Sequence, residues 1–168
     1  MVKRTATTMA KRTKYSQAEL MHYDTVIGTS GNFALMTVKP QQGDAGNQFV
    51  GSALNLKSID VSVYCGTAGT PGDAIRVTLL IPRDPSVVPT HLDPYRKYSE
   101  RDYIILHDEL IPRVASNGCR FKRNLTGKMK FNSTGTVTLE NNLMVAINLE
   151  AAASGNMFGG VRLYYTDP

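Results

Sequence analysis

The sequence is a succession of short segments rich in Val, Ile, Thr and Tyr, separated by clusters of Gly, Pro, Asn and Asp. This pattern is typical of β-strands joined by turns, and no long window repeats its apolar residues with a helical period. Strands are predicted at eight places, over residues 20–27, 33–38, 53–65, 74–81, 102–106, 119–131, 143–150 and 158–165. We therefore expect an all-β fold, an eight-stranded antiparallel sandwich of two sheets with Greek-key linkage.

The net charge is confined to the N-terminal end of the chain. Five positive charges lie there, on Lys3, Arg4, Lys11, Arg12 and Lys14. The chain has 19 basic and 14 acidic residues, so the 14 basic residues that follow the first five balance the acids. Residues 1–18 offer little to bury and are expected to form a disordered arm that binds a polyanion by displacing counterions from phosphates. Residues 19–168 are expected to form one domain.

The predicted strand at 119–131 has one basic side. Successive side chains of a strand point to opposite faces, and the residues of one parity include Arg120, Lys122, Lys128 and Lys130. Arg123 falls on the other, mostly apolar parity, which a bulge or bend near Gly127 would explain. We expect these five cations to contact nucleic acid; the alternative is a solvated sheet face. Of the nearby aromatic residues Tyr15, Phe121 and Phe131, the two Phe belong to the core by parity.

Two further segments have distinctive patterns. In the strand at 53–65 the apolar parity changes near Ser58, which predicts a twist or bulge. Its partly apolar faces indicate a central strand or one buried at a subunit contact. Residues 82–101 contain four prolines and no strand pattern, and loops of this length are usually functional. Cys65 and Cys119 lie in different predicted strands and are expected to be reduced, buried thiols.

The order of several segments resembles that of the single-jelly-roll capsid proteins of small icosahedral viruses. The chain is similar in this respect to the coat protein of satellite tobacco necrosis virus and to capsid proteins of circular Rep-encoding single-stranded DNA viruses. The segments are QQGDAGNQFVG at 41–51, LNLKSIDV at 54–61, RVTLLIPRD at 76–84, YIILHD at 103–108, the basic strand at 121–131 and VRLYYTD at 161–167. Phe49 departs from the pattern, because this family more often has Arg at that place.

The resemblance implies a jelly roll of two four-stranded sheets and a closed shell of sixty identical subunits. In such a shell the arm would hang inside and touch the packaged genome. The resemblance also nominates Asp44 and Asp167 as calcium ligands at subunit contacts, whereas the residues by themselves favour a surface carboxylate or a turn cap. No other cofactor is expected, and the three His residues have no zinc-ligand spacing.

The sequence therefore predicts a viral capsid protein that assembles with copies of itself and packages single-stranded DNA or RNA. The alternative is a non-viral jelly-roll binding module that forms a small oligomer, such as a trimeric ligand or a lectin-like domain. No nucleophile elbow or phosphate-binding Gly-Lys-Thr/Ser loop is present, so we do not expect an enzyme. No apolar run is long enough for membrane insertion. We expect the protein in the virion, and its two basic clusters also look like a nuclear import signal.

Overall fold

The computed structural model describes residues 21–29, 31–42, 51–65, 73–113, 118–135, 137–150 and 157–166. These residues form ten strands in two antiparallel sheets, and they include no helix. In the part of the chain described, nothing helical is therefore long and apolar enough to cross a membrane. The prediction of an all-β fold with antiparallel sheets is confirmed.

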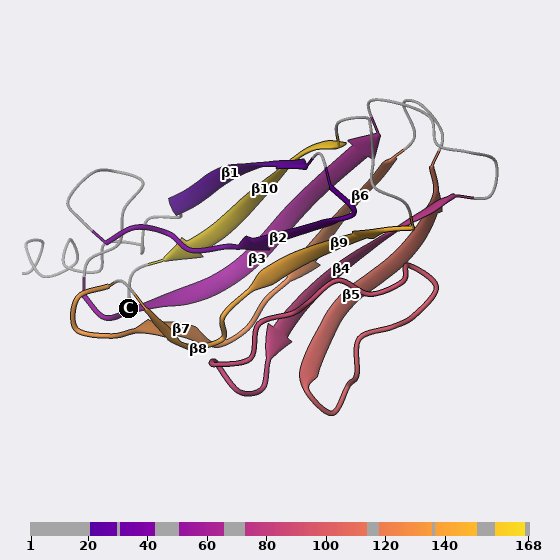
Figure 1. Cartoon of the computed structure of the whole chain (residues 1–168). Coiled ribbons are helices and arrows are strands. Elements are labelled where there is room, and N and C mark those ends of the chain that lie inside the picture. The colour runs from indigo at the N-terminus through magenta and orange to yellow at the C-terminus, as the bar shows by residue number, and fades with distance from the viewer. Residues whose placement is uncertain are drawn as a thin grey trace, which may run out of the picture.

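The ten strands are divided six to four between the two sheets, whose strands are labelled in Figure 1. The first sheet, called sheet A, contains β1 (Met21–Thr29), β10 (Met157–Thr166), β3 (Ala53–Cys65), β6 (Gly118–Asn124), β7 (Lys128–Phe131) and β8 (Thr138–Glu140). Its order is β1-β10-β3-β7-β8, and β6 pairs with the same edge of β3 as β7. The second, sheet B, has the order β2-β9-β4-β5, with β2 (Phe33–Thr37), β9 (Met144–Leu149), β4 (Ala74–Pro82) and β5 (Tyr103–Pro112).

The strand pairs are nested along the chain. β4 pairs with β5, β3 with β6 and β7, β2 with β9, and β1 with β10, all antiparallel. The first half of the described chain therefore pairs with the second half in reverse order, and most ladders join residues that lie far apart in the sequence.

The main core lies between the two sheets, because strands of both contribute their apolar parity to one buried cluster. Sheet A contributes Leu54, Ile59 and Tyr165, and sheet B contributes Leu79 and Ile147, all with no exposed surface. Burying each such side chain stabilises the fold by roughly 1.5–3 kcal/mol relative to leaving it exposed. The alternation of apolar residues that predicted the strands is thus what attaches the sheets to each other.

The predicted irregularity in β3 is confirmed. Along the β3–β10 ladder, Leu56 pairs with Tyr165 and Ser58 with Tyr164, so that Lys57 is skipped. This one-residue bulge reverses the parity of β3, which places both Leu54 and the later Ile59 in the core. β3 is also a central strand, with β10 on one side and β6 and β7 on the other.

The number of strands differs from the eight that the sequence predicted. The strand expected at 119–131 is divided into β6 and β7, and Gly127 between them has a φ of +93°. The strand expected at 102–106 continues to Pro112, because β4 pairs with it along its whole length. β8 was not predicted; it has three residues and is paired with β7.

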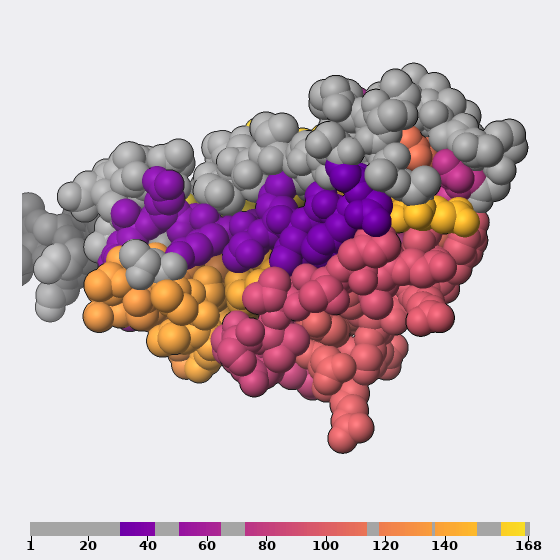
Figure 2. Space-filling model, viewed as in Figure 1, coloured from indigo at the N-terminus to yellow at the C-terminus, as the bar shows by residue number. Residues whose placement is uncertain are grey.

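The β4–β5 connection (residues 83–102) packs against the outer face of sheet B. Its Tyr98 belongs to a second buried cluster with Leu80 of β4 and Met144 of β9, and Phe33 of β2 packs against that cluster. Figure 2 shows this side of the molecule, where pink residues that include the connection adjoin the purple residues that include β2. The long excursion predicted at 82–101 is therefore an ordered cover for one sheet.

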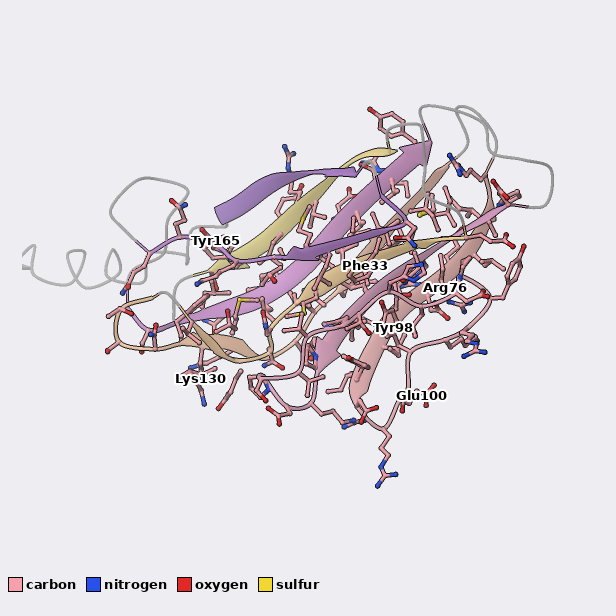
Figure 3. The ribbon with its side chains drawn as sticks, viewed as in Figure 1. Phe33, Arg76, Tyr98, Glu100, Lys130 and Tyr165 are labelled. Atoms are coloured by element: carbon pink, nitrogen blue, oxygen red, sulfur yellow. The ribbon has the colours of Figure 1, made fainter. Side chains whose placement is uncertain are left out.

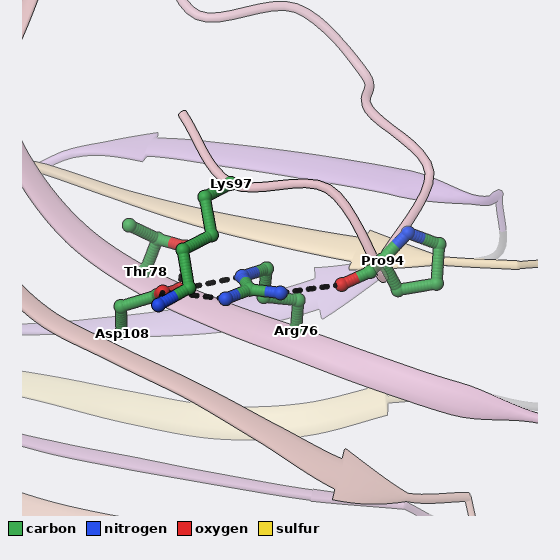
Figure 4. Close-up of polar contacts among 5 residues, drawn as sticks. All are labelled: Arg76, Thr78, Pro94, Lys97 and Asp108. Atoms are coloured by element: carbon green, nitrogen blue, oxygen red, sulfur yellow. Dashed lines mark hydrogen bonds and ion pairs between the residues drawn. The ribbon is translucent and has the colours of Figure 1, made fainter. Parts of the chain in front are cut away.

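Buried polar contacts hold the connection in place. The Arg76 side chain is buried, and its Nε and Nη2 donate to the two carboxylate oxygens of Asp108 over 2.6 and 2.5 Å (Figure 4). Its Nη1 donates to the Pro94 carbonyl oxygen of the connection over 2.8 Å. Farther along, the Tyr98 hydroxyl donates to the Thr90 carbonyl oxygen over 2.9 Å. Figure 3 labels Tyr98, which belongs to the connection, and Arg76, which lies beside it.

Candidate nucleic-acid interface

β6 and β7 place basic side chains on the outer face of sheet A. Their exposed residues include the four cations of one predicted parity, Arg120, Lys122, Lys128 and Lys130. Their buried residues face the core and include Cys119, Phe121, Met129 and Phe131. The predicted two-sided strand is confirmed in this respect. Cys119 is buried and forms no disulfide, whereas the Cys65 side chain lies outside the described residues.

Two neighbouring strands add cations that the sequence analysis missed. Lys57, the bulge residue of β3, is exposed, and so is Arg162 of β10. We call the resulting surface the basic face, and it consists of Lys57, Asp60, Arg120, Lys122, Lys128, Lys130 and Arg162. A signal for Arg162 was present, because it alternates with the apolar Val161 and Leu163. The signal for Lys57 was the parity change beside it.

Two carboxylates whose side chains the structure describes lie on or beside the basic face, and Asp24 of β1 pairs with Arg162 in the β1–β10 ladder. Asp60 pairs across the sheet with Arg162 on one side and Lys122 on the other, and its carboxylate accepts hydrogen bonds from Arg120 at 3.0 and 3.4 Å. The hydrogen bond and then the charge of Asp60 raise the pKa of Arg120, which therefore stays protonated. Lys130 contacts Glu140 of β8 at 2.7 Å. Exposed pairs of this kind contribute little to stability, so these cations are available to other anions.

Lys122 has an aromatic neighbour. Its ammonium nitrogen lies 5.3 Å from the centre of the Tyr164 ring, which reaches toward it from β10 across β3. Among the described residues, no carboxylate forms an ion pair with Lys122, Lys128 or Lys57, although Asp60 is the strand neighbour of Lys122. Three cations of the basic face are thus without a counter-charge from this part of the chain, and phosphate groups are the anions that exposed lysines of this kind bind without sequence preference.

Arg123 does not join the basic face. Its Nη2 donates to Nδ1 of His107 over 2.7 Å, and Nε2 of the same ring lies 3.0 Å from a Glu109 carboxylate oxygen. A guanidinium can only donate, so Nδ1 is the acceptor and Nε2 carries the proton that Glu109 accepts. The His107 ring stacks on Phe121 with centroids 3.7 Å apart. Arg123 thus links β6 to β5, the edge strands of the two sheets.

Several predicted site residues lie outside the described part of the chain. They are the arm residues Lys3, Arg4, Lys11, Arg12 and Lys14, and the calcium candidates Asp44 and Asp167. Within the described residues, no group of three or more His, Cys, Asp or Glu side chains is placed to hold a metal ion. The His91 ring contacts the Leu149 carbonyl oxygen at 3.1 Å, a structural contact between the β4–β5 connection and β9.

The two outer faces of the molecule differ in chemistry. Sheet B has an apolar outer face that the β4–β5 connection covers. Sheet A has a charged outer face, and no described segment packs over it. The residues that precede Met21 join sheet A through β1, so the basic arm is attached to the sheet that carries the basic face. No protein-family model matches this chain, and no curated protein matches it in sequence.

Proposed function

We propose that the chain is a viral capsid protein that assembles with copies of itself into a small icosahedral shell, of sixty subunits as in the family it resembles. The shell packages a single-stranded nucleic acid genome through non-specific phosphate contacts. The observation that carries the proposal is the placement of the charges. The basic arm is attached to sheet A, and no described segment packs over the outer face of the same sheet, where six described cations lie beside the carboxylates of Asp60 and Glu140 and Arg162 pairs with Asp24.

The strand order supports a jelly roll as the framework of such a shell. If β6 and β7 are counted as one bent strand, the orders become β1-β10-β3-β6/β7 and β2-β9-β4-β5. Two four-stranded sheets and nested pairs, from β4–β5 in the middle to β1–β10 at the outside, are the arrangement that a jelly roll requires. β8 is then a short addition at the edge of sheet A.

The charge balance supports both assembly and packaging. Apart from the first fourteen residues, the chain has equal numbers of acidic and basic residues, so neighbouring bodies do not repel one another through net charge. The arm and the basic face together provide the cations that would neutralise phosphates. Because isolated Lys and Arg side chains contact phosphates without reading bases, the packaging we propose is independent of sequence.

An exposed apolar area supports contact between copies. Ile104 of β5 and Leu139 of β8 are 39% and 50% exposed, and both line a hollow of about 320 Å³ whose other lining residues include the polar Arg83 and Glu140. Val137 beside them is 54% exposed. Exposed apolar residues that gather at one place are typical of protein–protein contacts.

The first test is the size and content of the purified particle. Size-exclusion chromatography with negative-stain electron microscopy should show uniform spheres, and the absorbance ratio of 260 to 280 nm should show co-purified nucleic acid. A chain without residues 1–14 should still associate but package less nucleic acid. A stable monomer without affinity for nucleic acid at low salt would contradict the proposal.

The basic face is tested separately from the arm. We expect Lys122→Ala with Lys128→Ala to weaken binding of a labelled oligonucleotide and to reduce the slope of log affinity against log salt by about 1.4, or 0.7 for each lost contact. The matched control is Arg96→Ala with Arg101→Ala, two exposed cations of the β4–β5 connection. Equal losses in both variants would mean that only net charge matters. A small oligomer with a protein-like absorbance ratio would instead favour the binding-module alternative.

A further inference from the structure

The basic face contains tyrosine as well as cations. Along β10, Leu163 and Tyr165 are buried in the core, so Tyr164 between them points outward, beside the exposed Arg162. Along β3, Val63 is buried and Tyr64 is 49% exposed. Both tyrosines therefore stand on the outer side of sheet A, on the two strands at its centre.

The Tyr164 ring is held over the middle of the sheet. Tyr164 pairs with Ser58 of β3, and Lys122 of β6 lies 5.3 Å from the centre of its ring. Because β3 lies between β10 and β6, the Lys122 side chain and the Tyr164 ring together span β3. A cation beside an aromatic ring, on a sheet, offers one group to a phosphate and another to a base.

Tyr64 pairs with Gly118 of β6 and with Phe158 of β10. Gly118 adds no side chain on the β6 side of the ring, which leaves Tyr64 49% exposed. A Cβ at Gly118 would lie 2.2 Å from the Val63 carbonyl oxygen, so a larger residue does not fit there. Two residues before Tyr64 on β3, Ser62 pairs with Gly160 of β10 on the same outer face of the sheet. Neither residue has a large side chain.

The two tyrosines mark the ends of one track on the basic face. Ser58, which pairs with Tyr164, lies six residues before Tyr64 on β3, a span of about 20 Å at the rise of a β-strand. The rows between them contain Arg162, Asp60 and Lys122, and then Arg120. The track therefore has an aromatic ring at each end and three cations between them, with the Asp60 carboxylate hydrogen-bonded to one of these, Arg120.

We propose that Tyr164 and Tyr64 are base-stacking residues, and that the basic face thereby prefers single-stranded nucleic acid to a duplex. The inference rests on the proposed function, since it needs nucleic acid at this face. Cations alone bind both forms, because both present phosphates. A duplex keeps its bases stacked on one another, whereas the bases of a flexible single strand are free to stack on aromatic side chains.

The test compares ligands that share phosphates and differ in bases. The full chain is titrated, by fluorescence anisotropy, into labelled oligothymidine, an abasic oligonucleotide of the same length and a duplex. We expect oligothymidine to bind at least roughly 10-fold more tightly than the abasic strand, as the size of base–aromatic stacking implies. Tyr164→Leu should remove most of this preference and leave the affinity for the abasic strand unchanged, and Tyr164→Phe should keep it.

Controls separate stacking from folding and from general affinity. Tyr64→Leu repeats the test at a half-exposed position, and Tyr95→Leu changes a tyrosine that is 55% exposed on the β4–β5 connection and should have no effect. If the wild-type chain binds both single strands equally, the stacking inference is wrong while the phosphate proposal stands. The inference is also wrong if both leucine variants keep the preference. If the wild-type chain binds no strand at low salt, the proposed function fails as well.

Discussion

Arg76 illustrates which hydrogen-bond partners a buried charged side chain requires. In the sequence it interrupts an apolar strand, and parity alone predicts that its side chain points outward. It does so, but the β4–β5 connection covers it, and Asp108 and the Pro94 carbonyl oxygen take up its hydrogen bonds. The sequence could not predict this site, because Asp108 and Pro94 reach Arg76 only after β5 has paired and the connection has folded back.

The Arg76–Asp108 pair gives a prediction about stability. Arg76→Leu should lower the free energy of unfolding in urea by about 3 kcal/mol, because the partly buried Asp108 carboxylate then keeps only Thr78 and the exposed Lys97 as partners. Replacing both residues by Leu should cost less than Arg76→Leu alone, since no uncompensated charge remains. If the loss in the double variant equals the sum of the two single losses, the two side chains are not coupled.

The same pair gives a prediction about pH. Burial acts to raise the pKa of Asp108, but the hydrogen bond and charge of Arg76, with help from Thr78 and Lys97, hold it below its ordinary value of 3.8. Since the folded-state pKa is the lower one, this stabilisation is present above about pH 4 and is lost as the pH falls below that value. The melting temperature of the wild-type chain should therefore fall more steeply than that of Asp108→Asn between pH 5 and pH 2.5, and parallel curves would contradict this.

At the scale of the element, the sequence pattern predicted strands correctly where turn residues flank them. It missed the parts of strands that form only because a neighbouring strand pairs with them. β3 has the predicted bounds, residues 53–65, because apolar alternation fills it and turn residues follow it. β5 was predicted to end at Leu106, since the next three residues, His107–Glu109, are polar. In the structure, pairing with β4 extends β5 to Pro112. The polar residues Asp108 and His107 then contact Arg76 and Arg123. The polarity that argued against a strand thus serves the contacts of an edge strand.

The break between β6 and β7 gives a prediction about a turn. Gly127 has a φ of +93°, and a Cβ built there would meet only the Asn141 side-chain nitrogen, at 3.6 Å. Space is therefore available, and the cost of Gly127→Ala should come from the backbone alone, about 1–3 kcal/mol. Gly127→Asn should cost less, because Asn tolerates positive φ better. Thermal unfolding of both variants measures this, and an unchanged Gly127→Ala variant would mean that the turn is not constrained.

For the whole molecule, the all-β class and the basic side of one strand were predictable, but the extent of the basic face was not. Lys57 and Arg162 belong to other strands, and only the pairing of β3 with β10 and β6 brings them beside Lys122. Arg123 was grouped with these cations by sequence proximity and lies instead at the edge between the sheets. Sequence gives parity within a strand, whereas a surface depends on the register between strands.

The hollow lined by Ile104 and Leu139 gives a prediction about assembly. Ile104→Asp with Leu139→Asp places charges where we propose that copies meet, so it should reduce the yield of large particles without unfolding the chain, because both side chains are partly exposed. The matched control is Val88→Asp, at a residue that is 58% exposed on the β4–β5 connection. Chromatography and circular dichroism measure the two effects, and equal particle yields for the two variants would exclude the hollow as a contact.

The nested strand pairs have a consequence for synthesis on the ribosome. The innermost pair, β4 with β5, is complete once Pro112 has left the exit tunnel, but β1 has no partner until β10, which runs from Met157 to Thr166, has followed it. A nascent chain can therefore fold from its middle outward but cannot finish sheet A while its last strand is still being translated. The edge of β10 that receives β1, and with it the complete basic face, can form only after Thr166 has been translated. The order of the strands thus delays any use of that face until β10 has left the ribosome.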